Sequence, residues 1–230
     1  MKVIRVFVIT ILLLLFAVPR VFAETNKQKA QELIVLSNYT FEHFMQDPNF
    51  KWFRDNLRDA KGLLICPQIL KGAFFIGGSG GNAVLIVKNA DGSWSQPAFY
   101  TLGGISFGFQ WGGQSSEIIL MIQSQKGIES LYSSSFKLGA DASVAVGPVG
   151  AGMEGSTAPN LSADYLSFAR AKGAFIGVAL DGTVISFRES YNTAYYGSKT
   201  SVRPVDILVE KKVSSKYSNK LIDSVANAVK

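Results

Sequence analysis

The sequence is poor in the side chains that most often perform catalysis or bind metal. Its 230 residues contain one cysteine, Cys66, and one histidine, His43, and only 17% of them are charged. A single cysteine excludes an intramolecular disulfide, and the acidic residues do not gather at ligand spacing, so we expect no metal site. His43 lies beside Phe44 in a segment with helical periodicity, which favours a packing or surface role. Cys66 follows an apolar run and is interpreted as a small core residue.

Complete motifs of familiar enzyme classes are also missing. A serine hydrolase needs a base to activate its nucleophile, and no Gly-x-Ser-x-Gly is followed by a histidine. The glycine cluster Gly77–Gly81 lacks the Gly-Lys-Ser/Thr of a phosphate-binding loop, and a strand pattern follows it instead of a helix. Two carboxylates distant in sequence can still meet in space, as in glycosidases, and that alternative stays open. We expect a protein that is not an enzyme and uses no cofactor.

Residues 1–23 have the pattern of a secretory signal peptide. A basic start precedes an apolar run over residues 6–18, and Val21-Phe22-Ala23 provides small residues at a cleavage site. The run is too short to span a bilayer comfortably. We therefore expect cleavage near Ala23, a mature chain that begins at Glu24, and a periplasmic or secreted location.

Net charge gives little support to nucleic-acid binding. The formal charge is +6, but the predicted leader holds three basic residues and no acid, which leaves +3 for the mature chain. The remaining excess lies in the tail, because residues 191–230 carry seven basic and three acidic side chains, against six and eight in residues 73–190. A solvated helix face would explain such a tail without any binding role.

The central stretch, residues 71–122, predicts a β-meander. Its apolar runs are rich in β-branched and aromatic residues and are separated by glycine clusters. Asn89-Ala90-Asp91-Gly92 supplies the positive-φ positions of a tight hairpin. Paired glycines weaken a strand unless a bulge, a corner or a close backbone approach requires them. These pairs are Gly77-Gly78, Gly80-Gly81, Gly103-Gly104 and Gly112-Gly113.

Further elements are predicted after the meander. Lys126–Tyr132 resembles a short helix, and the alternation over residues 140–146 predicts a strand. Asp181-Gly182 predicts a turn between strands at Phe175–Leu180 and Thr183–Phe187.

Helices are predicted at both ends of the mature chain. Residues 27–45 place an apolar stripe on one amphipathic face, and Asp47-Pro48 ends that helix. A second, shorter helix follows over residues 50–60, and residues 216–229 form a third, separated from residues 205–213 by Ser214-Ser215. The stripes of the first two helices consist of Ala30, Ile34, Ser37, Phe41 and Phe44, and of Phe50, Phe53, Leu57 and Ala60.

We therefore expect an α+β fold. It contains a twisted, largely antiparallel β-sheet or small barrel, with N-terminal helices and a C-terminal helix packed against it. We expect one domain over residues 24–230, with helices in 24–60, a β-rich core in 61–208 and a helix in 209–230.

Six segments in series resemble the SYLF domain. They are AKGLLICPQILKGAFFIGGSGG, DGSWSQPAF, LGGISFGFQWGGQSSEIILMI, LGADASVAVGPVG, AKGAFIGVALDGTVIS and NTAYYG, and the match as a whole extends from about Phe50 to Leu208. The resemblance implies a lipid-binding module of the kind shared by bacterial envelope proteins and eukaryotic membrane-trafficking proteins. It implies peripheral association with an anionic phospholipid or a phosphoinositide-like headgroup, without nucleic-acid binding. The alternative is a structural or scaffolding protein of the envelope that binds an unknown protein partner.

A cationic rim is the predicted lipid-binding site. Lys-Gly pairs at residues 61–62, 71–72 and 172–173 each precede an apolar run, so we expect the three lysines at strand entrances beside the second helix. The site residues are Lys51, Trp52, Arg54, Arg58, Lys61, Lys71, Arg170 and Lys172.

Trp52 has two interpretations at this point. An exposed tryptophan among cations is typical of a membrane interface, but the same residue can pack under the sheet. An internal apolar pocket that takes an acyl chain is the alternative to the cationic rim.

Overall fold

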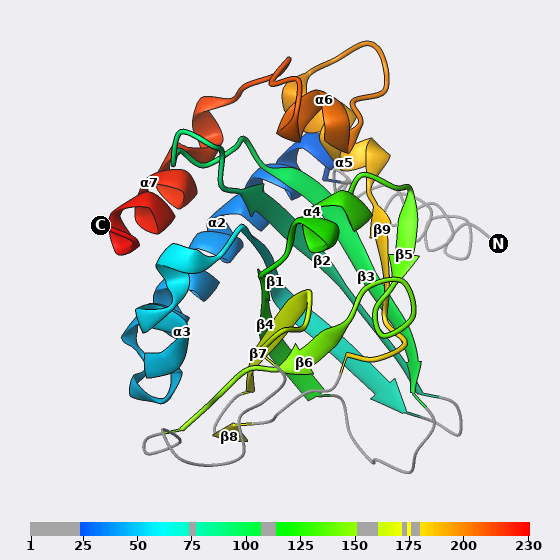
Figure 1. The fold of residues 1–230 in the computed structure, drawn as a ribbon. Coiled ribbons are helices and arrows are strands. Elements are labelled where there is room, and N and C mark those ends of the chain that lie inside the picture. The colour runs from blue at the N-terminus through cyan, green and yellow to red at the C-terminus, as the bar shows by residue number, and fades with distance from the viewer. Residues whose placement is uncertain (1–23, 74–76, 107–113, 151–160, 172–173, 176–179) are drawn as a thin grey trace, which may run out of the picture.

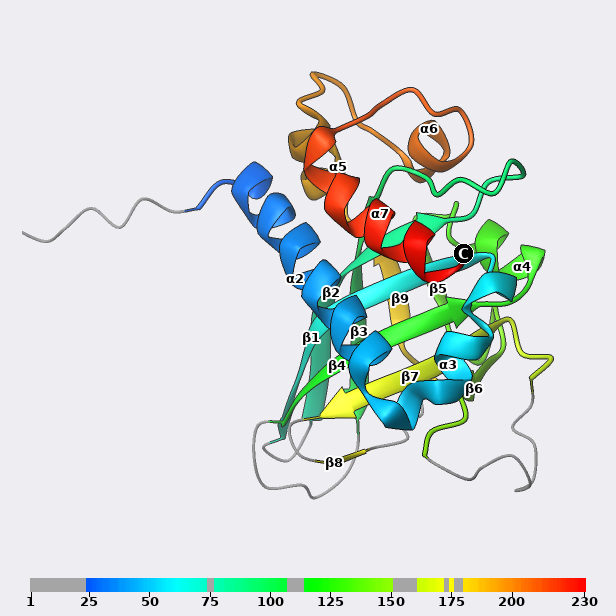
Figure 2. The same ribbon diagram turned by 90° about the vertical axis from the view of Figure 1, so that its left-hand side faces the viewer.

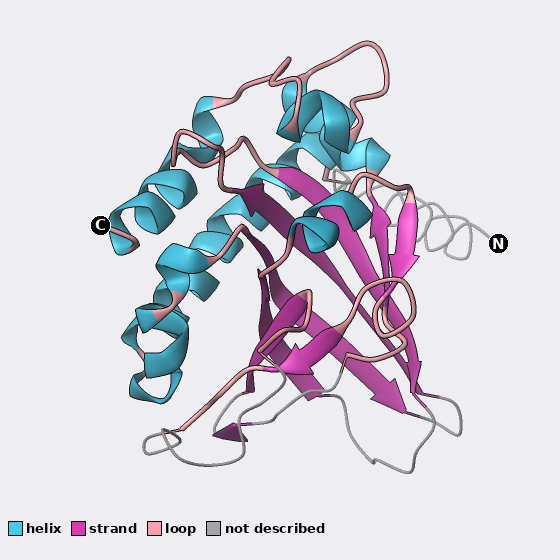
Figure 3. Cartoon of the chain, in the orientation of Figure 1, coloured by secondary structure: helices cyan, strands magenta, loops and turns pink. Residues whose placement is uncertain are grey.

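A computed structural model describes residues 24–73, 77–106, 114–150, 161–171, 174–175 and 180–230 of the chain. Figure 3 shows a mixed α+β architecture, which confirms the predicted fold class. The elements in chain order are α2 (Asn26–Gln46), η1 (Pro48–Phe50), α3 (Lys51–Asp55), η2 (Leu57–Asp59), β1 (Gly62–Ala73), β2 (Gly77–Val87), β3 (Ala98–Ser106), β4 (Gln114–Ile122), α4 (Gln125–Ser130), β5 (Ser135–Lys137), β6 (Val144–Val146), β7 (Tyr165–Ala171), β8 (Ala174–Phe175), β9 (Val184–Phe187), α5 (Glu189–Tyr196), α6 (Pro204–Leu208), η4 (Lys216–Ser218) and α7 (Asn219–Ala228).

The strands form one curled sheet. Its order is β5-β9-β3-β2-β1-β4-β7-β6, and β8 pairs with β7. All the pairings are antiparallel except β6 with β7. Figures 1 and 2 show α2, α3 and α7 on one face of the sheet and α4 on the other. We call these the outer and the inner face.

Both faces of the sheet are buried over residues 63–66 of β1 and 83–87 of β2. Leu63 and Ile65 of β1 pack with α2 on the outer face, whereas Leu64 and Cys66 belong to the inner cluster. Because neither face of these strands meets water, their sequences are continuous apolar runs without the polar alternation of a half-exposed sheet. Cys66 is a core residue, as predicted, and burial raises the pKa of its thiol to about 12.

The first helix matches its prediction closely. Thr25 and Gln28 form a capping box at the start of α2, and the predicted stripe is buried along its full length. The second helix does not match, because residues 48–59 divide into η1, α3 and η2. Asn56 is the C-cap of α3, and its side-chain amide donates to the Trp52 carbonyl at 2.9 Å, the same oxygen that accepts the Asn56 backbone N–H at 3.1 Å. The apolar stripe of this segment is nevertheless buried.

The structure explains why residue 81, in the pair Gly80-Gly81, is a glycine. A Cβ at this position would lie 2.3 Å from the Gln68 carbonyl oxygen and 2.8 Å from Cys66 Sγ. The register of β1 shifts between Ile65 and Gln68, so a β-bulge presses against Gly81. This confirms a close backbone approach, but β2 continues through residues 77–81 without interruption. Gly112-Gly113 lies outside the described residues.

The predicted turns and short elements have mixed outcomes. The turn at Gly92 (φ 82°) and α4 are confirmed. The strand predicted over residues 140–146 is reduced to β6. Gly182 (φ 81°) is a turn residue, but the expected hairpin partner includes residues 176–179, outside the described part, and β9 pairs with β3 and β5.

The C-terminal region differs from the helix expected over residues 209–230, because residues 209–215 are not helical and additional helices precede them. Helix α7 confirms the predicted helix in residues 216–229, and residues 209–215 separate it from α6, as Ser214-Ser215 indicated. Helices α5 and α6 were not predicted. Helix α5 buries Tyr191 and Tyr195 and ends at Gly197, whose φ of 64° stops the helix in the left-handed region.

Candidate lipid-contact surfaces and an adjoining cavity

The predicted cationic rim does not form one surface. Lys61 immediately precedes β1, but Lys71 lies near the other end of the same strand, and its Gly72 neighbour is inside β1. Ten residues of strand at about 3.3 Å each separate the two lysines by roughly 33 Å. The prediction that Lys71 marks a strand entrance is therefore wrong. The Lys71 side chain and the whole of Lys172 lie outside what the structure describes.

Two predicted cations of α3 already have local partners. Arg54 Nη1 donates to the carbonyl oxygens of Asp47 (2.5 Å) and Phe44 (3.5 Å), which lie at the C-terminal end of α2. Lys51 forms an ion pair with Asp55, one helical turn away. Arg54 thus stabilises the turn between α2 and α3.

Arg170 belongs to a charged network that ties α2 to the sheet. Its Nη1 lies 3.0 Å from Glu117 Oε2, and its Nε lies 3.4 Å from Asp47 Oδ2. Glu117 Oε1 also lies 2.8 Å from His43 Nδ1. Burial raises the pKa of Asp47, but hydrogen bonds from Asn49 and Arg170 outweigh this effect and lower the pKa below its usual value. Arg170 therefore has a structural partner on each side.

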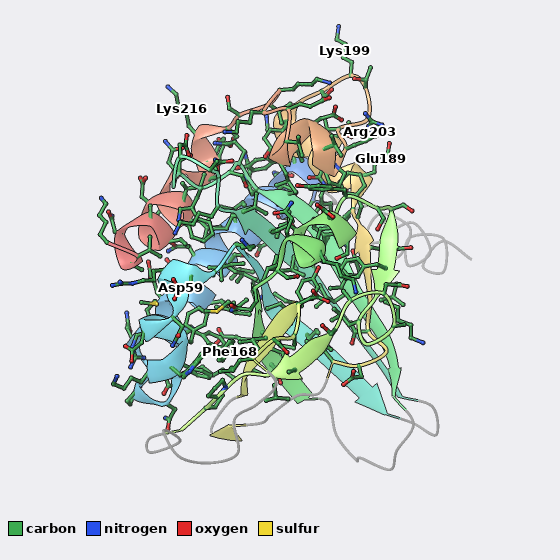
Figure 4. The ribbon with its side chains drawn as sticks, in the orientation of Figure 1. Asp59, Phe168, Glu189, Lys199, Arg203 and Lys216 are labelled. Atoms are coloured by element: carbon green, nitrogen blue, oxygen red, sulfur yellow. The ribbon has the colours of Figure 1, made fainter. Side chains whose placement is uncertain are left out.

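Trp52 packs against the sheet. Its ring stacks on Phe168 of β7, with centroids 6.0 Å apart and planes 22° apart, and the side chain is half-buried. Figure 4 labels Phe168 on the sheet beneath the N-terminal helices. This contact supports the packing interpretation of Trp52 over membrane insertion.

A smaller basic group remains at the start of β1. Arg58 and Lys61 are exposed, and Lys88 Nζ donates to the Arg58 carbonyl at 2.8 Å. Gly62 pairs with Val87, so these three residues share one end of the β1–β2 ladder. Exposed Asp59, labelled in Figure 4, reduces the positive charge of this group.

A second basic surface, absent from the predicted site, lies in the C-terminal region. We call it the basic end. Figure 4 shows Lys199, Arg203 and Lys216 extending from the end of the molecule that carries α5 and α6. Val209, which follows α6, and Tyr217, in η4, have exposed fractions of 51% and 65%. The basic end comprises Lys199, Arg203, Val209, Lys211, Lys212, Lys216 and Tyr217.

Some charges of the basic end are neutralised locally. Asp206 lies 3.4 Å from Arg203 Nε and 3.2 Å from Lys212 Nζ. The Arg203 backbone N–H donates to the Asp206 carboxylate and is the main cause that lowers its pKa to about 2. Lys199 and Lys216 are exposed and form no ion pair with any described residue. The tail charge that we attributed to a helix face therefore lies mainly in loops.

Hydrogen bonds to Gln96 hold the segment that carries Tyr217. Gln96 Oε1 accepts hydrogen bonds from the Ser215 backbone N–H (2.9 Å) and from Ser218 Oγ (3.0 Å). The Ser215 hydroxyl caps η4, which contains Lys216 and Tyr217. Tyr217 is therefore exposed on an anchored turn.

A cavity of about 520 Å³ lies between α2 and the sheet. Its wall on the helix side comes from the N-terminal half of α2, and its floor comes from β1, β2 and β3, with Tyr191 of α5 at one side. The lining mixes apolar, polar and charged groups. They are Glu24, Lys29, Glu32, Leu33, Leu36, Pro67, Gln68, Gly80, Gly81, Asn82, Thr101 and Tyr191.

Two features of the described residues limit the classes of site. No group of three or more His, Cys, Asp or Glu side chains among them is placed to hold a metal ion. None of the helices that can be described has the length and apolar character to cross a membrane.

The fold is that of a small α+β domain, and comparison with known proteins identifies its family. The profile of the family described as "Ysc84: Las17-binding protein actin regulator" matches residues 103–228, more than half of the chain. The chain therefore belongs to the Ysc84 family, which confirms the SYLF resemblance.

The similar curated proteins are eukaryotic. Human SH3 domain-containing YSC84-like protein 1 is 31% identical over 150 residues, which cover 65% of this chain and 43% of that protein. The fission yeast SH3 domain-containing protein PJ696.02 is 32% identical over 143 residues (61% and 33%). LAS seventeen-binding protein 3 of budding yeast is 29% identical over 154 residues (66% and 33%). The chain thus matches less than half the length of each of these relatives.

Proposed function

We propose that this protein is a non-enzymatic module that binds anionic phospholipid at a membrane surface. The basic end carries this proposal, because it combines exposed cations with the exposed apolar side chains of Val209 and Tyr217. Lysines near an anionic surface are attracted to it, and apolar side chains that enter the interface strengthen the attachment. Since Tyr217 lies on an anchored turn, it needs little ordering on binding.

We propose that the membrane is that of the bacterial envelope. The signal-peptide pattern of residues 1–23, which lie outside the described structure, supports export to the periplasm. A general anionic phospholipid is then the expected ligand, and a phosphoinositide-like headgroup is the more specific variant.

Vesicle binding by two charge-matched variants tests which surface makes the contact. The first variant carries Lys199→Gln, Lys211→Gln and Lys216→Gln, and the second carries Lys51→Gln, Arg58→Gln and Lys61→Gln. Each lysine near an anionic surface contributes about 1 kcal/mol, so the first variant should bind phosphatidylglycerol-containing vesicles roughly two orders of magnitude more weakly. The second variant removes the same charge from the predicted rim. Equal loss in both variants would indicate attraction by net charge alone, and loss only in the second would restore the rim.

Binding of a protein partner is the second candidate function. Val35, Leu36 and Tyr39 of α2 have exposed fractions of 52%, 44% and 48% and lie on neighbouring turns of its outward side. The names of the family profile and of the budding yeast relative refer to binding of a protein. A Val35→Ser, Tyr39→Ser variant should lose a protein partner but keep vesicle binding. Loss of vesicle binding in this variant would instead place the lipid contact on α2.

A further inference from the structure

Gly80 forms part of the floor of the cavity beside α2. The backbone does not require glycine at this position. A Cβ at Gly80 would meet only the Leu102 carbonyl oxygen, at 3.7 Å, which is an ordinary contact. Gly80 also lacks the positive φ that favours glycine. Its neighbour Gly81 differs, because the β-bulge of β1 leaves no room there. Glycine weakens a strand, and neither a close contact nor the backbone conformation requires it here. The absence of a side chain at position 80 therefore needs another explanation.

Strand alternation directs position 80 toward α2. Val84 and Ile86 of β2 belong to the outer cluster with α2, whereas Ala83 and Leu85 belong to the inner cluster. Asn82 and Gly80 have the same parity as Val84, so they face the outer side. Figure 2 shows α2 lying across this face of the sheet. A side chain at position 80 would therefore enter the cavity.

A half-buried cation lies beside the cavity floor. Arg188 Nη1 donates to Oδ1 of Asn82 and lies 3.5 Å from Thr101 Oγ1, and both acceptors line the cavity. The guanidinium carbon lies 3.8 Å from the centroid of the Tyr191 ring, another lining residue. Among the described residues, no carboxylate pairs with Arg188. Arg188 does not itself line the cavity, but partly desolvated cations usually have an anionic partner, so this charge, held at the lining side chains of Asn82 and Thr101, would attract an anion in the cavity.

The walls continue as an apolar path to the surface. Leu33, Leu36 and Pro67 line the cavity, and exposed Leu36 lies on the same side of α2 as Val35 and Tyr39. A hydrocarbon chain can follow this path out of the cavity. The cavity volume lies within the range of about 300–1,000 Å³ that small-molecule sites occupy.

The acidic residues of the lining lie at its mouth. Glu24 and Glu32 are exposed, and so is Lys29 between them in sequence. Exposed charges are screened by water and salt more than the half-buried guanidinium is, so they oppose an anion at the floor only weakly.

We infer that this cavity binds one amphipathic anion, with its phosphate or carboxylate beside Arg188 and Asn82 and its hydrocarbon chain along Leu33 and Leu36. The ligand is a single lipid-like molecule, and its site is distinct from the basic end. The inference does not depend on attachment to a membrane surface.

Binding of dodecyl phosphate below its critical micelle concentration tests this inference by titration calorimetry of the full chain. We expect saturable binding of one molecule. Gly80→Val fills the floor, and Arg188→Gln removes the charge but keeps a donor for Asn82. Loss of one charged hydrogen bond corresponds to roughly 10- to 100-fold weaker binding, and we expect at least the lower value in each variant.

Thermal unfolding separates occupation of the cavity from damage to the fold. Valine favours strands more than glycine does, so Gly80→Val should keep or raise the midpoint of unfolding while affinity falls. The variant with Lys199→Gln, Lys211→Gln and Lys216→Gln should bind dodecyl phosphate as the natural chain does. This result would hold even if vesicle binding through the basic end failed its own test.

Three outcomes with dodecyl phosphate alone would overturn the inference. They are absence of saturable binding, unchanged affinity in both Gly80→Val and Arg188→Gln, and loss of binding only in the variant of the basic end. Dodecanoate and inorganic phosphate identify the recognised group. Equal affinity for inorganic phosphate and dodecyl phosphate would contradict the role of the chain, whereas tighter binding of either dodecyl compound supports it and names the headgroup.

Discussion

Trp52 and Phe168 lie stacked across the contact between α3 and β7, with ring centroids 6.0 Å apart. Phe168 also contacts Phe50 and Phe53 and is fully buried, so this ring joins the N-terminal segment to the sheet. A tryptophan in this position serves packing first. The arrangement predicts that damage at Phe168 releases residues 48–59 from the sheet.

The variant Phe168→Ala should therefore lose about 3–5 kcal/mol of unfolding free energy, the usual cost of deleting a buried aromatic ring. Chemical denaturation measures the loss. As a control, Tyr217→Ala removes an exposed ring and should change stability by less than about 0.5 kcal/mol. A small effect of Phe168→Ala would contradict the packing role of this contact.

Gly80 and Gly81 form a matched pair for a second prediction. An alanine at position 81 would collide with the Gln68 carbonyl at 2.3 Å, so Gly81→Ala should destabilise the fold by about 1–3 kcal/mol. Gly80→Ala meets only an ordinary contact and should be neutral or stabilising. Equal effects of the two substitutions on the midpoint of denaturation would show that the bulge does not press on β2.

Cys66 gives a prediction about pH. Burial raises the pKa of its thiol from 9.0 to about 12, so the unfolded chain releases this proton at lower pH than the folded chain does. Stability that comes from the protonated thiol is complete below pH 9 and is lost as the pH rises toward 12. Cys66→Ala should show a smaller loss of stability over this interval. Iodoacetamide should alkylate the native chain near neutral pH far more slowly than the unfolded chain, and comparable rates would contradict the burial of Cys66.

Export makes a fourth prediction. If residues 1–23 are removed as a signal peptide, protein isolated from the periplasm should begin at Glu24. N-terminal sequencing or intact-mass measurement of that fraction checks this. A retained Met1 in the periplasmic fraction would contradict cleavage.

Local patterns predicted the parts of the fold that local physics determines. The stripe of α2, the Gly92 turn and the core position of Cys66 follow from periodicity, turn chemistry and burial, and the structure confirms all three. The break at Asn56 falls inside the second predicted helix, and a stripe of apolar residues does not reveal where a helix is interrupted. Helix α5 was missed because its buried tyrosines lie in a segment that we assigned to the β-rich core.

The candidate site was harder to predict, because it depends on which charges are paired. Arg54 and Arg170 have the residue type of a lipid contact, but their partners in the fold are Phe44, Asp47 and Glu117. These partners are up to 123 residues distant in sequence. Lys61 and Lys71 share a Lys-Gly motif, yet they lie near opposite ends of the same strand, β1. The uneven charge of residues 191–230 was the signal that pointed to the basic end.

Titration of the natural chain with vesicles tests the central claim most directly. The chain should bind phosphatidylcholine vesicles that contain phosphatidylglycerol and should bind pure phosphatidylcholine vesicles much more weakly. This attraction should fade with salt, because the Debye length falls from about 10 Å at 0.1 M to about 3 Å at 1 M. Equal binding to both kinds of vesicle, or no binding to either at low salt, would contradict the proposal that this protein attaches to anionic membrane surfaces.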